Sequence, residues 1–210
     1  MVRRTKLDTE QTRRSILDAA RSTFLERGLM GTTLEDVAGA AGVTRGAIYW
    51  HFANKKALFD AMRGEVCVPT IDRTDVTMLA AGATSGDPLD AIERFLTDLI
   101  TGVTRCPATR ETFEIMAFKC EYVGDFEKEL GEHRRKSVEM RDVLAGVYRR
   151  ARAAGALRSG LPPAVAAAAT LVFMMGLLRM WLLDTESSLV RPHVKSLIAA
   201  HVDAMRKHAA

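Results

Sequence analysis

Five closely spaced side chains could together bind a polyanion. Thr44, Arg45, Tyr49, His51 and Lys55 all carry hydrogen-bond donors. The guanidinium fork of Arg45 matches the two acceptor atoms that guanine presents in the major groove of DNA. The other four side chains are of types that bond phosphate oxygens. The pattern therefore predicts base reading by Arg45 and backbone contacts by Thr44, Tyr49, His51 and Lys55.

The segment before these residues predicts the first of two short helices. A capping box begins it, with Thr32 or Thr33 as the cap and Glu35 or Asp36 as its partner. The apolar residues that follow share one helical face: Leu34, Val37, Ala38 and Ala41. The N-terminus of this helix, at Thr33, would be directed at a DNA backbone because helix N-termini favour phosphate.

A glycine turn joins this helix to the one that carries Arg45. Gly42 can adopt the left-handed conformation that ends a helix, and Thr44 caps the next helix. Gly46 leaves room for a ligand to approach closely. The arrangement is that of a helix-turn-helix, whose second helix enters the major groove. An ordinary three-helix core with a charged surface is the alternative, because helix-turn-helix patterns are loosely specified.

The charge of the chain is unevenly distributed. Residues 1–64 hold 11 Lys and Arg against 7 Asp and Glu, whereas residues 65–210 hold 19 of each kind. The formal net charge of +4 therefore belongs to the first part. Such a local excess favours a polyanionic partner, although it sets encounter rate more than sequence choice.

Other functional classes find little support in the sequence. There is no glycine-rich phosphate loop, nucleophile elbow or spaced histidine and carboxylate pair, so we expect no enzyme, no catalytic residue and no cofactor. Cys67, Cys106 and Cys120 are far apart and match no metal motif, which is typical of reduced thiols in the cytoplasm. The N-terminus lacks the apolar region of a signal peptide. We therefore expect a cytoplasmic protein without a bound metal.

Helical periodicity predicts an all-α fold. We expect a helix-turn-helix DNA-binding domain over residues 1–53 and a ligand-binding and dimerisation domain over 54–210. The expected helices lie from Thr9 to a stop at Gly28, from Asn54 towards a break at Pro69, and over 88–103, 110–122, 126–154, 162–183 and 192–207.

The segment 162–183 is nearly long and apolar enough to span a membrane, and no charged residue lies between Arg158 and Arg179. Its alanine cluster and the charge of Arg179 favour burial instead, against a ligand core on one side and a partner subunit on the other. With the last helix it would form a four-helix dimer interface. The sequence thus predicts a homodimer and no membrane contact.

The chain also resembles a known family. Residues 33–59, with VTRGAIYWHFANKKALF at their centre, resemble the signature of the TetR family of transcriptional repressors. The opening MVRRTK, FKCEY at 118–122 and LLRMWLL at 177–183 resemble the AcrR and TtgR branch, which represses multidrug efflux pump genes. The resemblance implies a dimer that binds a palindromic operator and is released by a small hydrophobic or aromatic effector. A TetR-type regulator of lipid or catabolic genes, or a ligand-independent DNA-binding protein, would fit the same residues.

The effector pocket is expected among apolar side chains of the second domain, where unbranched methionines can adapt to ligands of varied shape. The resemblance adds Val66, and it implies that a change at Val66 or Cys67 shifts the population of DNA-competent dimers. The candidate contacts are Val66, Phe95, Leu96, Leu99, Phe113, Met116, Ala117, Cys120, Met140, Leu144, Leu171, Phe173, Met174, Met175 and Arg179.

This chain departs from the branch at three of these positions. Phe113, Ala117 and Met175 stand where the branch can present polar side chains, so we expect a more apolar pocket. Arg179 is the one charge that could meet an acidic or phenolic group. It could equally pair with Glu114 or Glu121 for structural reasons.

Overall fold

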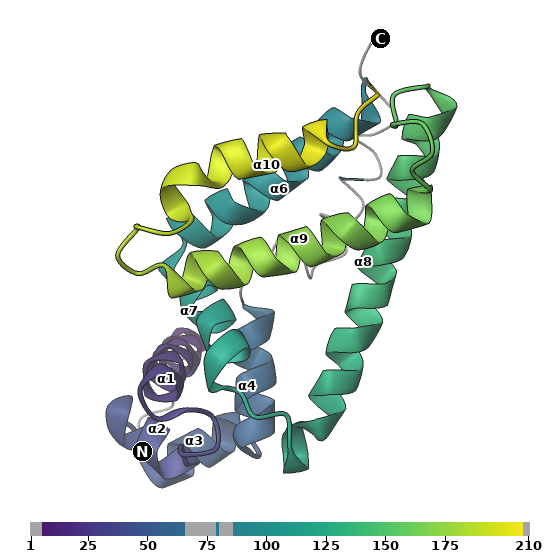
Figure 1. The fold of residues 1–210 in the computed structure, drawn as a ribbon. Coiled ribbons are helices and arrows are strands. Elements are labelled where there is room, and N and C mark those ends of the chain that lie inside the picture. Colours follow the sequence, from purple (N-terminus) through teal and green to yellow (C-terminus); the bar gives the residue numbers. More distant parts are fainter. Residues whose placement is uncertain (1–5, 66–78, 80–85, 208–210) are drawn as a thin grey trace. The chain divides into compact units, whose positions relative to one another are not determined.

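The computed structural model of the chain describes residues 6–65, 79 and 86–207. Apart from one isolated bridge between Leu157 and Arg206, every regular element in this part is helical, which confirms the predicted all-α fold. The α-helices are α1 (Lys6–Arg27), α2 (Leu34–Ala40), α3 (Arg45–His51), α4 (Lys55–Gly64), α6 (Pro88–Arg105), α7 (Pro107–Glu114), α8 (Glu127–Ala153), α9 (Pro163–Leu183) and α10 (Val194–Asp203) (Figure 1).

Several helix boundaries differ from the predicted ones. The helix expected over 110–122 begins at Pro107, because proline is well tolerated in the first turn, and it changes at Ile115 into a π-helix, η1 (Ile115–Lys119). The last helix was expected from 192 but starts at Val194, after a 3-10 turn, η3 (Arg191–His193). The predicted break at Pro69 lies outside the described residues.

Contacts divide the chain into two compact units. Unit 1 comprises Met1–Cys67 and Cys106–Leu130, and unit 2 comprises Val68–Arg105 and Gly131–Ala210. Unit 1 therefore adds α4, α7 and η1 to the three helices of the predicted DNA-binding domain. The functional boundary after residue 53 stays a prediction.

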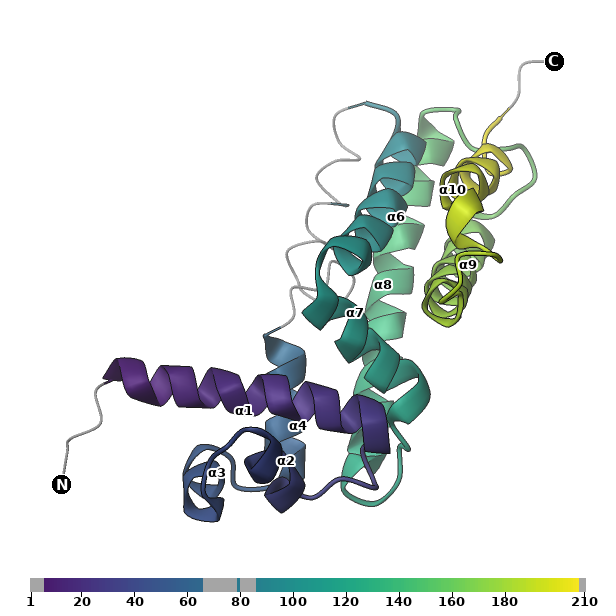
Figure 2. The same ribbon diagram turned by 90° about the vertical axis from the view of Figure 1, so that its left-hand side faces the viewer.

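Unit 1 is built around α1, which packs against α2, α4, α7 and η1 (Figure 2). The predicted inward residues Ile16, Leu17 and Phe24 of α1 are fully buried. The ring of Phe59 on α4 contacts Phe24 edge-on, at 6.4 Å between centroids, and the ring of Phe126 at 5.6 Å. This apolar core fixes the short helices α2 and α3, which are too short to be stable alone.

A charged cluster joins α4 to the start of α8 within unit 1. Glu129 is 2% exposed and lies 2.8 Å from Lys56 and 2.5 Å from Arg63. Burial raises the pKa of the Glu129 carboxyl, but Lys56 and Arg63 outweigh that effect and the pKa is lowered. The ion pairs therefore hold the first turn of α8 against α4.

Unit 2 contains α6, α9, α10 and most of α8. Figure 1 shows α10 lying along α6 and beside α9. A buried polar chain crosses its core, with the Tyr148 hydroxyl 2.6 Å from Thr170 Oγ1 and Thr170 Oγ1 2.8 Å from His201 Nε2. The ring of Phe173 stacks on His201 at 4.1 Å. Because each hydroxyl has a partner, helices α8, α9 and α10 bury these groups without the cost of an unsatisfied polar atom.

One carboxylate organises the connection between α9 and α10. Asp184 is buried and accepts four backbone N–H bonds, from Ser188 at 2.8 Å, Leu189 at 3.0 Å, Val190 at 2.9 Å and Arg191 at 2.8 Å. Burial raises the pKa of Asp184, but the four donors outweigh it and hold the pKa at about 2. The connection therefore has a fixed shape with an ionised carboxylate at its centre.

Helix α9 is long and apolar enough to cross a membrane by length and composition alone, with a mean hydropathy of 1.8. However, 44% of that window is buried within the chain. Ala166, Thr170 and Trp181 lie among its buried residues, whereas Val165 and Val172 are exposed. The helix thus packs on one side and leaves an apolar surface on the other.

Candidate DNA-binding site

The start of α2 is fixed by the predicted capping box. Thr33 Oγ1 accepts the backbone N–H of Asp36 at 3.1 Å, and an Asp36 carboxylate oxygen accepts the backbone N–H of Thr33 at 2.8 Å. The hydrogen bonds from Thr33 lower the pKa of the Asp36 carboxyl, and Arg27 adds to the effect from 3.1 Å. The sequence allowed Thr32 with Glu35 or Thr33 with Asp36 as the capping box, and the structure contains Thr33 with Asp36. The Glu35 side chain can therefore make another contact.

The turn and the start of α3 also follow the prediction. Gly42 has a φ of 65°, in the left-handed region, and Thr44 Oγ1 accepts the backbone N–H of Ala47 at 3.2 Å. Ile48 is the only buried residue of the seven in α3. A Cβ atom added at Gly46 would meet no atom within 4 Å beyond its chain neighbours and the backbone of its own helix. Helix α3 is therefore anchored at one point and presents most of its surface outward.

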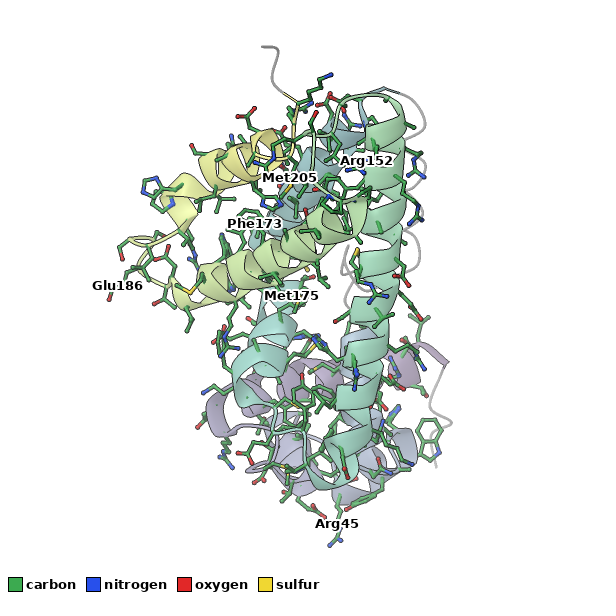
Figure 3. The ribbon with its side chains drawn as sticks, turned by 45° about the vertical axis from the view of Figure 1, so that its right-hand side comes forward. Arg45, Arg152, Phe173, Met175, Glu186 and Met205 are labelled. Carbon is green, nitrogen blue, oxygen red and sulfur yellow. The ribbon has the colours of Figure 1, made fainter. Side chains whose placement is uncertain are left out.

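Arg45 is the most exposed of the predicted charged contacts, with 75% of its side chain accessible. Figure 3 shows it extending away from the ribbon. Its Nε lies 3.1 Å from Oε1 of Glu35, and its guanidinium lies 5.6 Å from the ring centroid of Tyr49. The Tyr49 hydroxyl donates to the same Glu35 oxygen at 3.2 Å. Arg45 and Tyr49 thus share one face of the unit, as base reading together with a backbone contact requires.

Lys55 has a role that the sequence did not suggest. Its Nζ donates to the backbone carbonyls of Leu29 at 2.7 Å, Thr32 at 2.9 Å and Met30 at 3.4 Å. These bonds secure the connection between α1 and α2, because they give three of its backbone carbonyls a charged donor. In the free chain the Lys55 ammonium thus bonds carbonyls, and to contact DNA as predicted it would have to divide its N–H donors between these carbonyls and a phosphate.

The sequence reasoning missed Trp50. Its side chain is 71% exposed on α3, and its ring meets the ring of the half-buried His51 edge-on at 4.6 Å. The signal was available, because two helical positions separate Trp50 from the buried Ile48 and turn it to the opposite face. The exposed indole adds a flat apolar surface to α3.

The predicted effector contacts are distributed over both units. In unit 1, Phe113 is buried, Ala117 is half-buried, and Met116 and Cys120 pack half-buried against the core. Burial raises the pKa of the Cys120 thiol to about 11, so it is protonated and unreactive near neutral pH. Val66 lies outside the described residues.

The remaining candidates belong to unit 2. Leu171 and Phe173 are half-buried on α9. Met175 is 39% exposed and Arg179 is exposed, so in the free chain they lie on the surface of α9 rather than in a core. The buried candidates in this unit are Phe95, Leu96, Leu99, Met140, Leu144 and Met174. A single pocket that joins these residues to those of unit 1 stays a prediction.

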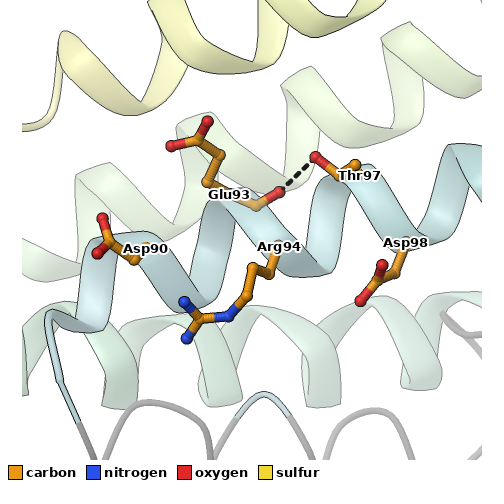
Figure 4. Close-up of a pocket in the computed structure, with 5 residues that line it drawn as sticks. All are labelled: Asp90, Glu93, Arg94, Thr97 and Asp98. Atoms are coloured by element: carbon orange, nitrogen blue, oxygen red, sulfur yellow. Dashed lines mark hydrogen bonds between the residues drawn. The ribbon is translucent and has the colours of Figure 1, made fainter.

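A depression on α6 has a volume of about 320 Å³ (Figure 4). It is lined by Asp90, Glu93, Arg94, Thr97 and Asp98. All five are charged or polar, they come from one helix, and none is a predicted effector contact. An apolar effector would find no desolvated surface here, so we do not place it at this depression.

Comparison with family models shows which protein family the chain belongs to. The model described as bacterial regulatory proteins, tetR family, matches residues 16–62, which hold α2, α3 and most of α4. The model described as MAATS-type transcriptional repressor, C-terminal region, matches residues 87–207. The chain belongs to the TetR family. It is a transcriptional repressor with a helix-turn-helix, and it is not an enzyme.

Relatives along the whole length agree with this family. The HTH-type transcriptional regulator TtgR of Pseudomonas putida is 34% identical over 213 residues, covering 98% of this chain and 97% of TtgR. The crystal structure of NalD, the secondary repressor of the MexAB-OprM multidrug efflux pump in Pseudomonas aeruginosa, has a TM-score of 0.81 at 28% identity, covering 97% of this chain and 100% of NalD. A complex of SmeT with triclosan has a TM-score of 0.75 at 26% identity, covering 95% of this chain and 93% of SmeT; SmeT represses a multidrug efflux pump of Stenotrophomonas maltophilia. The resemblance to efflux-pump repressors read from the sequence is thereby confirmed.

Proposed function

We propose that this TetR-family repressor acts in the cytoplasm as a homodimer on a palindromic operator. A small hydrophobic effector releases it, and the operon that it controls encodes a multidrug efflux pump. The observation that carries the proposal is the exposed face of α2 and α3, with Arg45 75% accessible on a helix that the tetR model covers. NalD and SmeT, both described as repressors of multidrug efflux pumps, support the regulated operon, and the triclosan complex of SmeT supports an aromatic effector.

Arg45 is the proposed base reader. An arginine bonds the O6 and N7 atoms of guanine with two parallel N–H groups, and this is the commonest specific contact in the major groove. Thr33, Thr44, Tyr49, His51 and Lys55 are the proposed backbone contacts, which position the helix without reading sequence. Gly46, with open space around it, lets the DNA backbone approach the start of α3.

The apolar surface of α9 and α10 is the proposed dimer interface. Six large apolar side chains on these two helices are at least one-third exposed: Val165, Val172, Met175, Met180, Leu183 and Leu197. A second copy of the same surface would bury them, as in the apolar core of an obligate dimer. A two-fold dimer can place two recognition helices in successive major grooves about 34 to 36 Å apart, which requires an inverted repeat.

The proposed route from effector to DNA runs through the π-helix η1. Met116 and Ala117 lie in η1, and π-helices mark functional segments in many proteins. The carbonyl of Lys119, at its end, accepts the backbone N–H of Leu29 at 2.9 Å, and the carbonyl of Leu29 accepts Lys55 Nζ. An effector that binds better when η1 is rearranged would shift this relay and with it α2 to α4. The sequence-based route through Val66 and Cys67 lies outside the described residues.

The experiment is fluorescence anisotropy on the promoter DNA upstream of the chain's own gene, with and without a panel of apolar aromatic compounds that includes triclosan. We expect the protein to bind promoter DNA even when unrelated DNA is present as competitor. At least one compound should reverse this binding. Specific binding that no compound affects would contradict the effector and favour a ligand-independent repressor. Binding that does not discriminate between promoter and unrelated DNA would overturn the operator itself.

A further inference from the structure

Glu35 lies between the two side chains on which the proposed recognition face depends. Its Oε1 accepts the Tyr49 hydroxyl at 3.2 Å and forms an ion pair with Arg45 Nε at 3.1 Å. The guanidinium of Arg45 lies 5.6 Å from the centroid of the Tyr49 ring. Three side chains from α2 and α3 thus contact one another in a closed set. None of the roles proposed above uses Glu35.

We propose that Glu35 is a positioning residue that orients Arg45 for base reading and thereby sets operator specificity. This inference rests on the proposed role of Arg45 as the base reader. The carboxylate acts through Arg45 and does not need to contact DNA.

The geometry of the arginine fork gives the physical reason. A guanidinium is planar and presents its donors along fixed edges. Because the Glu35 carboxylate lies 3.1 Å from Nε, on that side of the guanidinium, the edge formed by Nη1 and Nη2 is the one left to face guanine. Within the described part of the chain, no hydrogen bond engages either of these two nitrogens. Glu35 and the Tyr49 ring together restrict a long side chain that would otherwise sample many orientations, and this preorganisation lowers the entropy lost on binding.

Glu35 lies in the first turn of α2, where an acidic side chain stabilises the helix, but its contact with Arg45 adds little to that. The side chains of Arg45 and Glu35 are 75% and 44% exposed, and ion pairs between exposed groups contribute little to stability. A negative charge on a surface that binds a polyanion also opposes binding. The charge of Glu35 therefore opposes binding to all DNA alike, and what its contact with Arg45 can add is discrimination between sequences.

The test replaces Glu35 by glutamine, which keeps the shape and removes the charge. The probes are duplexes that carry the inverted repeat of the chain's own promoter with each half-site base pair changed in turn, and a duplex of scrambled sequence. For Glu35→Gln we expect tighter binding to the scrambled duplex. Discrimination at the position that Arg45 reads should fall roughly two- to five-fold, the range that corresponds to one exposed ion pair.

The matched control is Glu26→Gln, which removes the same charge from an exposed position on α1. It should change binding to all duplexes by the same factor and leave discrimination unchanged. In the Arg45→Ala background, Glu35→Gln should cause no further loss of discrimination.

Two results would overturn the inference, and they separate it from the proposed function. If Arg45→Ala alters discrimination at one position while Glu35→Gln behaves like Glu26→Gln, the orienting role of Glu35 is wrong and Arg45 remains the base reader. If Arg45→Ala leaves discrimination unchanged at every position, the base-reading role fails, and the inference about Glu35 fails with it.

Discussion

Helices α3 and α9 leave opposite kinds of side chain on the surface of the free chain. Helix α3 has seven residues, buries only Ile48 and exposes Arg45, Tyr49 and Trp50. Helix α9 has 21 residues and exposes aliphatic side chains such as Val172, which is 72% accessible. A stable soluble fold explains neither surface by itself. Each surface indicates a partner of matching chemistry, a polyanion for α3 and an apolar surface for α9.

A charged substitution on the exposed face of α9 should have the largest effect on operator affinity. In Val172→Asp, a short charged side chain would be placed in the proposed dimer interface, at a cost of about 3 kcal/mol or more. Operator affinity should then fall about 100-fold or more, because single recognition helices bind few base pairs. Light scattering after size-exclusion chromatography should report a monomer.

The control for this substitution is Val123→Asp. Val123 is 51% exposed, lies outside α9 and α10, and should tolerate a charge without loss of the dimer. A Val172→Asp protein that remains dimeric would show that α9 does not supply the interface.

A substitution at Lys55 should have a smaller effect on DNA binding. It separates residues that stabilise the unit from residues of α3 that are proposed to read bases. Lys55→Met should lower the free energy of unfolding by about 2 kcal/mol, because backbone carbonyls in the connection between α1 and α2 lose a charged donor. Binding to operator and to unrelated DNA should weaken by the same factor. Urea unfolding measures the change in stability, and fluorescence anisotropy on both duplexes measures the change in affinity.

Arg45→Ala is the counterpart on α3 itself. It should leave the free energy of unfolding unchanged within about 0.5 kcal/mol, cost about 1 to 3 kcal/mol in operator binding and relax the preference at one position.

If Lys55→Met left stability unchanged, the three carbonyl bonds would not secure the connection between α1 and α2.

The smallest expected effect concerns Gly46. Gly46→Ala should raise the free energy of unfolding by about 0.5 to 1 kcal/mol, since alanine favours helix and the added methyl group meets nothing within 4 Å beyond its own helix. Operator affinity should fall nevertheless, because the methyl group occupies the space proposed for the DNA backbone.

Gly39→Ala in α2 is the matched control, with equally open surroundings. It should give the same gain in stability and leave operator affinity unchanged. Equal operator affinity for both variants would show that DNA does not approach Gly46 closely.

The parts of the site that the sequence predicted correctly are those determined by neighbouring residues. The Thr33 cap, the left-handed Gly42 and the Thr44 cap each depend on bonds within three or four positions. Local chemistry of this kind is visible in a sequence. The helical phase that exposes Trp50 was equally visible but was not used.

The parts that escaped prediction depend on contacts between distant segments. Lys55 bonds carbonyls more than twenty positions earlier, and Glu129 pairs with Arg63 across 66 positions. The π-helix at Ile115–Lys119 also contacts a distant segment, because the backbone N–H of Leu29 donates to the carbonyl of Lys119 at its end. Tertiary packing decides such features, and a single sequence does not specify which segments meet.

The carboxylate of Asp184 has a consequence for how fast two chains can associate. By bonding four consecutive backbone N–H groups it fixes the connection between α9 and α10 before any partner arrives. Association then does not have to order that segment, so less conformational entropy is lost at the encounter. A surface that is already in its final shape can form a stable complex on more of its collisions, so we expect the proposed dimer to form faster than one whose connection must first be ordered.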